Sequence, residues 1–198
     1  MAHSLISIPR PPLIVLYQFS DMKTKIALLL LLCISSFAAF CQQQWKPASS
    51  EVSFKIKNAG ATVTGHFQGL KTTLVFSKTK LETSSLEGSI DVATIKTGIH
   101  ERDKHLKRKK YFDADNYKTI EIASVELYNK GTQYAGKFNV TIKGTTKQME
   151  IPFDFIERGN EATFKSSFIL NRRDYDVGGK NMIMSDQLIV SIDIKAIK

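Results

Sequence analysis

The segment from His100 to His105 carries two histidines and Glu101, side chain types that often hold a catalytic zinc ion. The helical zinc-protease motif places its histidines four residues apart, on one face of a helix. Here the histidines are five residues apart, which turns the second about 140° away from the first. Since no third ligand is evident either, we expect no metal site and a surface position for this segment.

Other catalytic arrangements are missing as well. Asp113 and Asp115 lack the glycine and the closing glutamate of a calcium loop, so we expect them to cap a turn. There is no G-x-S-x-G motif, no phosphate-binding glycine loop and no carboxylate pair for acid–base chemistry. Two cysteines are too few for a disulfide scaffold or a four-cysteine zinc site. We therefore expect no catalytic residues and no enzyme activity.

Residues 22–41 have the layout of a signal peptide. Lys23 and Lys25 precede an uncharged stretch from Ile26 to Phe40, which is shorter than the roughly 20 residues that a membrane span needs. Cleavage is expected after Cys41, with a cut after Ala38 or Ala39 as the close alternative. Because Phe40 is bulky, lipid attachment to Cys41 is disfavoured, and we expect ordinary export to the periplasm or the medium.

The leader also divides the chain. Residues 1–21 precede a complete signal peptide, so we expect them to be the unstructured product of an over-long start, with Met22 as the true start. Residues 42–198 are then the exported domain. Their length suits one folded unit.

Apolar and polar residues alternate through most of this domain. The alternation is clear at 52–57, 138–143, 149–155 and 188–194, and turn residues such as Gly159-Asn160 separate the segments. Only the 99–112 region has the composition of a short helix. About eight half-buried antiparallel strands without crossover helices predict an all-β fold, either a sandwich or a barrel.

Inward-facing apolar residues are the candidate ligand contacts of a barrel. Eight closed strands enclose space for side chains or one small ligand. Small residues on the inner face, namely Gly88, Gly136 and Ser166, leave volume that larger side chains or a ligand must fill. The predicted apolar pocket consists of Phe54, Ile56, Phe76, Ile90, Phe112, Phe138, Val140, Phe153, Phe155, Phe168, Leu170 and Val190.

A positively charged run from Lys104 to Lys110 is the strongest charge feature in a chain of net charge +9. It is either a solvated helix face or a surface that attracts anionic lipid or a phosphate-bearing ligand. Nucleic acid is disfavoured because only Tyr111 and Phe112 follow the charges, and base stacking needs exposed aromatic residues between them. The candidate polar residues at the mouth of the barrel are Arg102, His105, Lys107 and Arg172.

Several segments, taken in order and spacing, resemble the YceI-like family. The stretch Arg102 to Lys107, followed by Tyr111-Phe112-Asp113, is similar to the most specific motif of that family. In the following strand, Lys118 stands where the family usually has proline, and Ile122 where it usually has phenylalanine. The other matching segments are Trp45 to Phe54, Thr64 to Phe67, Tyr117 to Ser124, Gly136, Thr141 to Lys147 and Arg172 to Tyr175.

The resemblance implies an antiparallel, eight-stranded, lipocalin-like β-barrel exported to the periplasm. Such a barrel would hold a polyisoprenoid, a quinone-type lipid or a fatty amide for transport or storage, with no cofactor beyond that bound lipid. The family supplies no catalytic residues, and Arg102 and Asp103 fit a structural role equally well. An anionic membrane surface and a homodimer remain open as partners. The alternative is a non-enzymatic envelope or stress-related interaction module with a fully packed barrel.

Overall fold

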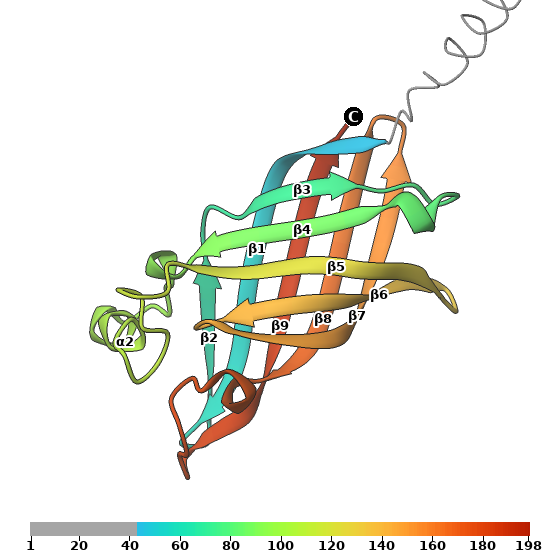
Figure 1. Ribbon diagram of the computed structural model, residues 1–198. Coiled ribbons are helices and arrows are strands. Elements are labelled where there is room, and N and C mark those ends of the chain that lie inside the picture. Colours follow the sequence, from blue (N-terminus) through green and yellow to red (C-terminus); the bar gives the residue numbers. More distant parts are fainter. Residues whose placement is uncertain (1–42) are drawn as a thin grey trace, which may run out of the picture. The chain divides into compact units, whose positions relative to one another are not determined.

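Nine β-strands and one short α-helix form residues 43–198, the part of the chain that this computed structural model describes (Figure 1). The expected leader and over-long start lie outside these residues. No helix within 43–198 has the length and apolar character required to cross a membrane. The elements are β1 (Gln44–Asn58), β2 (Ala61–Phe67), β3 (Lys71–Val75), η1 (Leu81–Thr83), β4 (Ser85–Asp91), η2 (Val92–Thr94), α2 (His100–Leu106), β5 (Thr119–Lys130), β6 (Gln133–Ile142), β7 (Thr145–Arg158), β8 (Glu161–Asn171), η3 (Arg172–Tyr175) and β9 (Met184–Ile197).

The ring of strands closes at β1. This strand pairs with β9 along most of its length, and its first residues, Gln44 and Trp45, pair with β3. The strands β3 to β9 are each paired with the next, so eight strands form a closed antiparallel barrel and β2 is a hairpin partner of the second half of β1. The predicted eight-stranded barrel is confirmed, and ring closure excludes the sandwich.

The alternating segments form the strands as predicted. The two-residue turn Gly159-Asn160 joins β7 to β8, where Arg158 pairs with Glu161. The helix is also in the predicted region, but it ends at Leu106 rather than continuing through the basic run. Tight turns follow, in which the N–H of Arg108 donates to the carbonyl of His105.

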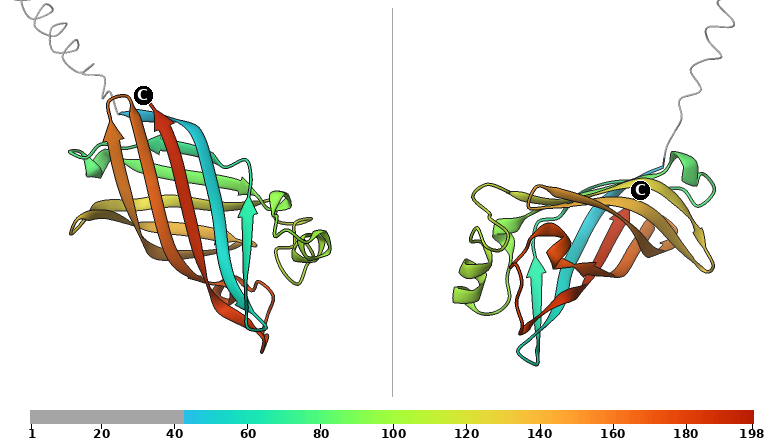
Figure 2. Two further views of the ribbon diagram at one scale, coloured as in Figure 1. Left: turned by 180° about the vertical axis from the view of Figure 1, so that it is seen from behind. Right: turned by 60° about the horizontal axis from the view of Figure 1, so that its bottom comes forward.

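Strand β7 links two halves of the barrel whose strands run crosswise (Figures 1 and 2). Its first half pairs with β6 as far as Phe153, and its second half pairs with β8 from Asp154 onward. Pro152, at the change of partner, has no N–H to donate. Its carbonyl instead accepts a hydrogen bond of 2.7 Å from the hydroxyl of Ser166 on β8.

Aromatic side chains pack solidly into the end of the barrel where β9 terminates. Phe76 is completely buried at their centre, and the indole N–H of Trp45 donates to its carbonyl at 3.1 Å. Edge-to-face and tilted ring contacts of this kind stabilise aromatic clusters beyond the burial of their area. The ring centroid of Phe76 lies 4.6 to 5.7 Å from those of Tyr134, Phe153, Phe155 and Phe164.

Candidate functional site

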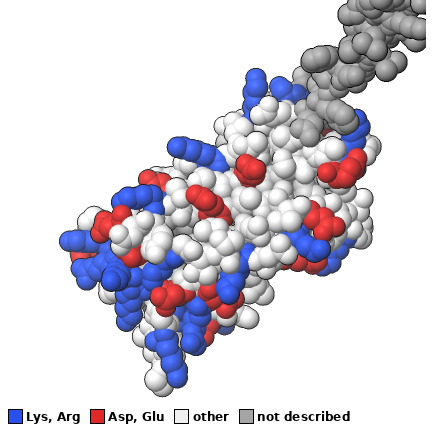
Figure 3. All heavy atoms as spheres, viewed as in Figure 1, with Lys and Arg blue, Asp and Glu red and all other residues white. Residues whose placement is uncertain are grey.

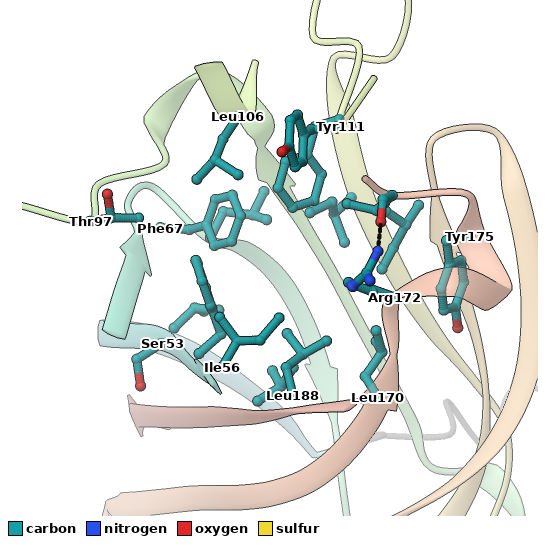
Figure 4. Close-up of a pocket in the computed structure, with 18 of the residues that line it drawn as sticks. Ser53, Ile56, Phe67, Thr97, Leu106, Tyr111, Leu170, Arg172, Tyr175 and Leu188 are labelled. Atoms are coloured by element: carbon teal, nitrogen blue, oxygen red, sulfur yellow. Dashed lines mark hydrogen bonds between the residues drawn. The ribbon is translucent and has the colours of Figure 1, made fainter. Parts of the chain in front are cut away.

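The opposite end of the barrel contains an apolar cavity of about 480 Å³ (Figure 4). Its walls are the inner faces of β1, β8 and β9 on one side and of β4, β5 and β6 on the other. Leu106 and Tyr111, from the segment around α2, and Tyr175 and Val177, from the segment after β8, also line this end. The volume falls within the range of small-molecule sites, which is roughly 300–1,000 Å³.

Eight of the twelve predicted apolar residues line this cavity. They come from five strands of the ring, namely β1, β4, β6, β8 and β9, and from the turn after α2, so segments far apart in the sequence meet at one site. These residues are Phe54, Ile56, Ile90, Phe112, Val140, Phe168, Leu170 and Val190.

The other four predicted residues lie elsewhere, so their assignment to this cavity is wrong. Phe76 and Phe155 belong to the packed aromatic cluster. Phe138 and Phe153 line a small cavity of about 80 Å³, and Phe153 also borders a separate pocket of about 470 Å³. The error has a simple origin, because the same alternation continues into the packed end, where an inward side chain contacts other side chains rather than open space.

The three small residues predicted on the inner face differ in whether they leave space inside the barrel. Gly88 lines the cavity, where an added Cβ would lie 3.1 Å from a methyl group of Ile122. At Gly136 the space is already occupied, since an added Cβ would lie 2.5 Å from Leu127 and 2.9 Å from Phe138. Ser166 lines the smaller cavity. Of the three small residues, Gly88 is the one that widens the main cavity.

Several lining residues were absent from the predicted set. Ile120, Ile122, Leu188 and Ile192 lie on strands and follow the same alternation, so the sequence carried a signal for them. The residues contributed by loops follow no period, because only the closure of the barrel places them there. The lining residues not predicted include Val52, Val63, Phe67, Leu70, Leu106, Tyr111, Ile142, Tyr175, Val177 and Met184.

Arg102 and Asp103 fix the loop before α2. The buried carboxylate of Asp103 accepts hydrogen bonds from the backbone N–H of Thr97 at 2.8 Å and from its hydroxyl at 2.5 Å. The Thr97 hydroxyl bond is the largest cause that lowers the pKa of Asp103 below its ordinary value. Arg102 donates to the same hydroxyl and to the Thr97 carbonyl. Arg102 lines the cavity edge, but it is held by the loop.

Arg172 lines the cavity wall with its donors already used. Its side chain is only 4% exposed, and all three of its nitrogens donate hydrogen bonds within the protein. One of these bonds, at 2.7 Å, goes to the carboxylate of Asp186. The expected role as a polar mouth residue is corrected, because Arg172 ties together the segment that closes the cavity. Its other acceptors are the carbonyls of Val177, Gly179, Met184 and Ser185.

His105 and Lys107 differ in their position relative to the mouth of the cavity. His105 is exposed, and its ring lies edge-on to Tyr111 with a centroid distance of 5.0 Å. It lines the cavity together with Glu101, which is also exposed, so the cavity reaches the surface beside α2. Lys107 is not a lining residue and lies in the turn outside. Across residues 43–198, no group of three or more His, Cys, Asp or Glu side chains is placed to hold a metal ion.

A closed antiparallel barrel, packed at one end and hollow and apolar at the other, defines a class of small β-barrel with an interior cavity. The family model described as the YceI-like domain matches residues 44–196. The chain therefore belongs to the YceI-like family.

Curated relatives agree with this assignment. A UPF0312 protein of Vibrio cholerae is 26% identical over 140 residues, which cover 67% of this chain and 74% of the relative. A UPF0312 protein of Photorhabdus laumondii is 25% identical over 153 residues, which cover 72% of this chain and 79% of the relative.

Solved structures share the fold. The crystal structure of Burkholderia cenocepacia BcnA superimposes with a TM-score of 0.71 at 24% identity, covering 74% of this chain and 96% of BcnA. A polyisoprenoid binding domain from Saccharophagus degradans superimposes with a TM-score of 0.57 at 11% identity, covering 78% of this chain and 97% of that domain. At these identities the likeness establishes a common barrel architecture.

Proposed function

We propose that this protein is a non-catalytic carrier that binds a long apolar ligand in the barrel cavity, for transport or storage in the periplasm. The ligand class is a polyisoprenoid, a quinone-type lipid or a fatty amide. The observation that carries the proposal is the cavity of about 480 Å³ and its predominantly apolar lining. The name of the Saccharophagus degradans domain supports the ligand class, and the signal peptide expected at 22–41 supports the compartment.

The chemistry of the lining favours the ligand chain over its headgroup. Each buried methylene contributes about 0.8 kcal/mol, whereas a neutral hydrogen bond contributes about 1 kcal/mol in total. The two arginines that line the cavity already use their donors within the protein. Arg102 donates to Thr97, and Arg172 donates to Asp186 and to its other acceptors. A ligand would therefore gain most of its affinity from Phe54, Phe168 and the other hydrocarbon side chains.

The alternative interaction module required a fully packed barrel. Packing is complete around Phe76 at one end of this barrel, but the cavity remains at the other. The cavity therefore favours the carrier function over an interaction module with a fully packed barrel.

The direct test is to identify what the protein carries. We expect native mass spectrometry of the protein purified from its own host to show an additional apolar mass, which organic extraction releases. Protein that is empty by this measurement, and that also fails to bind a fluorescent fatty probe, would contradict the carrier function.

Two neighbouring residues of β9 provide a matched pair of variants. Val190 lines the cavity, whereas Ile189 points outward and is 46% exposed. We expect Val190→Trp to reduce binding of the fatty probe at least about tenfold, because the larger side chain fills the ligand space. Ile189→Trp adds a similar bulk on the outer face and should leave binding within about twofold of the unsubstituted protein. Equal effects of the two substitutions would place the probe outside the cavity.

A further inference from the structure

Two loop segments meet at the cavity end of the barrel. One is the basic turn Lys107–Lys110, and the other is Lys180–Ile183, just before β9. The N–H of Gly178 donates to the carbonyl of Lys110 at 2.9 Å, which ties the two loops together. The carbonyl of Ile183 accepts from the N–H of Ala59 at 2.7 Å, which joins them to the β1–β2 turn. We call these two segments the rim.

The positive charges of the rim are unpaired. Within residues 43–198, no carboxylate oxygen lies within ion-pairing distance of any side chain of Lys107–Lys110 or of Lys180. Two nearby carboxylates are already engaged, Asp176 by Lys143 and Asp186 by Arg172. Figure 3 shows the Lys and Arg side chains gathered over this end of the molecule. The rim therefore presents a concentrated positive surface.

Two large apolar side chains project from the same rim. Met182 is 98% exposed and Ile183 is 63% exposed, and they are adjacent in the sequence. Their side chains are not needed for the core of the barrel. Exposed apolar residues flanked by Lys and Arg are typical of surfaces that insert into the interface of a lipid bilayer.

We propose that the rim docks on an anionic lipid bilayer, with Met182 and Ile183 entering the interface and the basic side chains binding lipid headgroups. This inference rests on the proposed carrier function, because the same rim borders the cavity. Tyr111 follows the basic turn and Met184 follows Ile183, and both line the cavity wall. A lipid leaving the bilayer at the rim would therefore reach the apolar cavity without crossing open water.

The aromatic residues next to the rim do not favour nucleic acid. Phe112 is half-buried and packs edge-on against Phe67 at a centroid distance of 6.0 Å. Tyr111 is half-buried against His105. Stacking of nucleic-acid bases needs free aromatic faces, whereas a bilayer needs only charge and the exposed apolar tip.

Vesicle flotation tests the proposal directly. The protein is purified from cells that export it, its N-terminus is determined by mass spectrometry, and binding is compared on vesicles of phosphatidylcholine with and without phosphatidylglycerol. We expect Arg108→Gln/Lys109→Gln/Lys110→Gln to lower binding to the anionic vesicles at least about tenfold at low salt. The matched control is Lys46→Gln/Arg158→Gln/Lys195→Gln, which removes the same charge at the packed end and should change binding less than about twofold.

Three results would overturn the docking proposal. The first is that the unsubstituted protein does not float with anionic vesicles, or floats equally with neutral ones. The second is an equal loss in the rim and control variants, which would assign binding to net charge alone. The third is unchanged binding after Met182→Ser/Ile183→Ser, for which we expect at least about a threefold loss.

A second measurement separates this proposal from the carrier function. A fluorescent fatty probe is offered to each variant in solution without vesicles. The rim variant should fill its cavity normally, because none of its three substituted residues lines the cavity. If the unsubstituted protein floats with anionic vesicles but binds no probe, docking stands and the carrier function fails. If it binds the probe but does not float, the carrier function stands and the docking proposal fails.

Discussion

The ring of Phe54 on β1 lies over Gly65 on the neighbouring strand β2, its direct partner in the antiparallel pair. A Cβ at residue 65 would lie 2.2 Å from the tip of this ring, closer than any side chain can approach. The ring also packs against Phe67 at a centroid distance of 5.8 Å. The absence of a side chain at Gly65 therefore fixes one aromatic wall of the cavity.

Substitution of Gly65 by Ala should displace this ring. We expect Gly65→Ala to destabilise the protein by about 1–3 kcal/mol, the usual cost of inserting bulk into a packed contact. It should also weaken binding of the fatty probe, because Phe54 lines the cavity. Urea unfolding and probe titration measure the two effects. Thr64→Ala, at the exposed neighbouring position, is the control, and an equal loss in both variants would exclude the ring contact as the cause.

The loop that closes the cavity should depend on Arg172. Replacing this buried guanidinium by Met leaves several carbonyls without their donor and removes the closer of the two arginines that bind Asp186. We expect Arg172→Met to lower the free energy of unfolding by about 3–5 kcal/mol. Arg173→Met removes a half-exposed neighbour with one contact of 3.4 Å to Asp186 and should cost less than about 0.5 kcal/mol. Similar unfolding midpoints for the two variants would contradict this assignment.

Stability at acid pH should depend on Glu157. Hydrogen bonds from Lys198 and Lys78, at 2.7 and 2.8 Å, lower the pKa of its carboxyl from the ordinary value of 4.5 to about 2. A carboxyl whose pKa is lowered by folding stabilises the protein above its unfolded pKa, and this contribution is lost as the pH falls toward the folded pKa. The contribution therefore disappears between pH 4.5 and about 2.

The corresponding variant is Glu157→Gln, compared with Glu161→Gln at an exposed position of the same hairpin. We expect Glu157→Gln to be less stable than the unsubstituted protein at pH 7 by less than about 2 kcal/mol, since charges near the surface are screened. The difference should shrink as the pH approaches 3. Thermal unfolding across this range measures it, and a deficit that does not vary with pH would rule out the ion pairs as its source.

The length of the ligand chain should control affinity more than its headgroup does. In a series of straight-chain fatty amides, we expect affinity to rise about fourfold for each added methylene until the cavity is full. Exchange of the amide for an alcohol should change affinity less than about fivefold. Competition against the fluorescent probe measures both series. If affinity varied with the headgroup but not with chain length, the result would contradict an apolar site.

Alternation in the sequence was sufficient to predict the strands, because a half-buried strand needs one apolar face wherever it lies. Ring closure confirms the expected barrel. The same pattern could not separate Phe54 from Phe76, since both point inward. What distinguishes them is the neighbouring strand. Glycine faces Phe54, whereas four aromatic rings surround Phe76.

Residues outside the strands were the hardest to predict. Arg172 looks in the sequence like a free cation near the barrel end, but its acceptors follow it by five to fourteen residues, in the loop after η3 and in the first three residues of β9. Arg102 and Asp103 were recognised as an equally plausible structural pair, and their bonds to Thr97 confirm that role. Interactions like these depend on the path of a loop, which residue spacing does not specify.

The pairing of β1 with β9 has a consequence for how the molecule assembles. These are the first and last strands of the described chain, and their register extends from Lys46 with Ile197 to Asn58 with Met184. Contacts between segments so distant in sequence form slowly, because the chain loses the entropy of closing a long loop before these contacts stabilise it. During synthesis the seam of the barrel must therefore wait for β9 to emerge, and until then β1 and β8 each keep an unpaired edge.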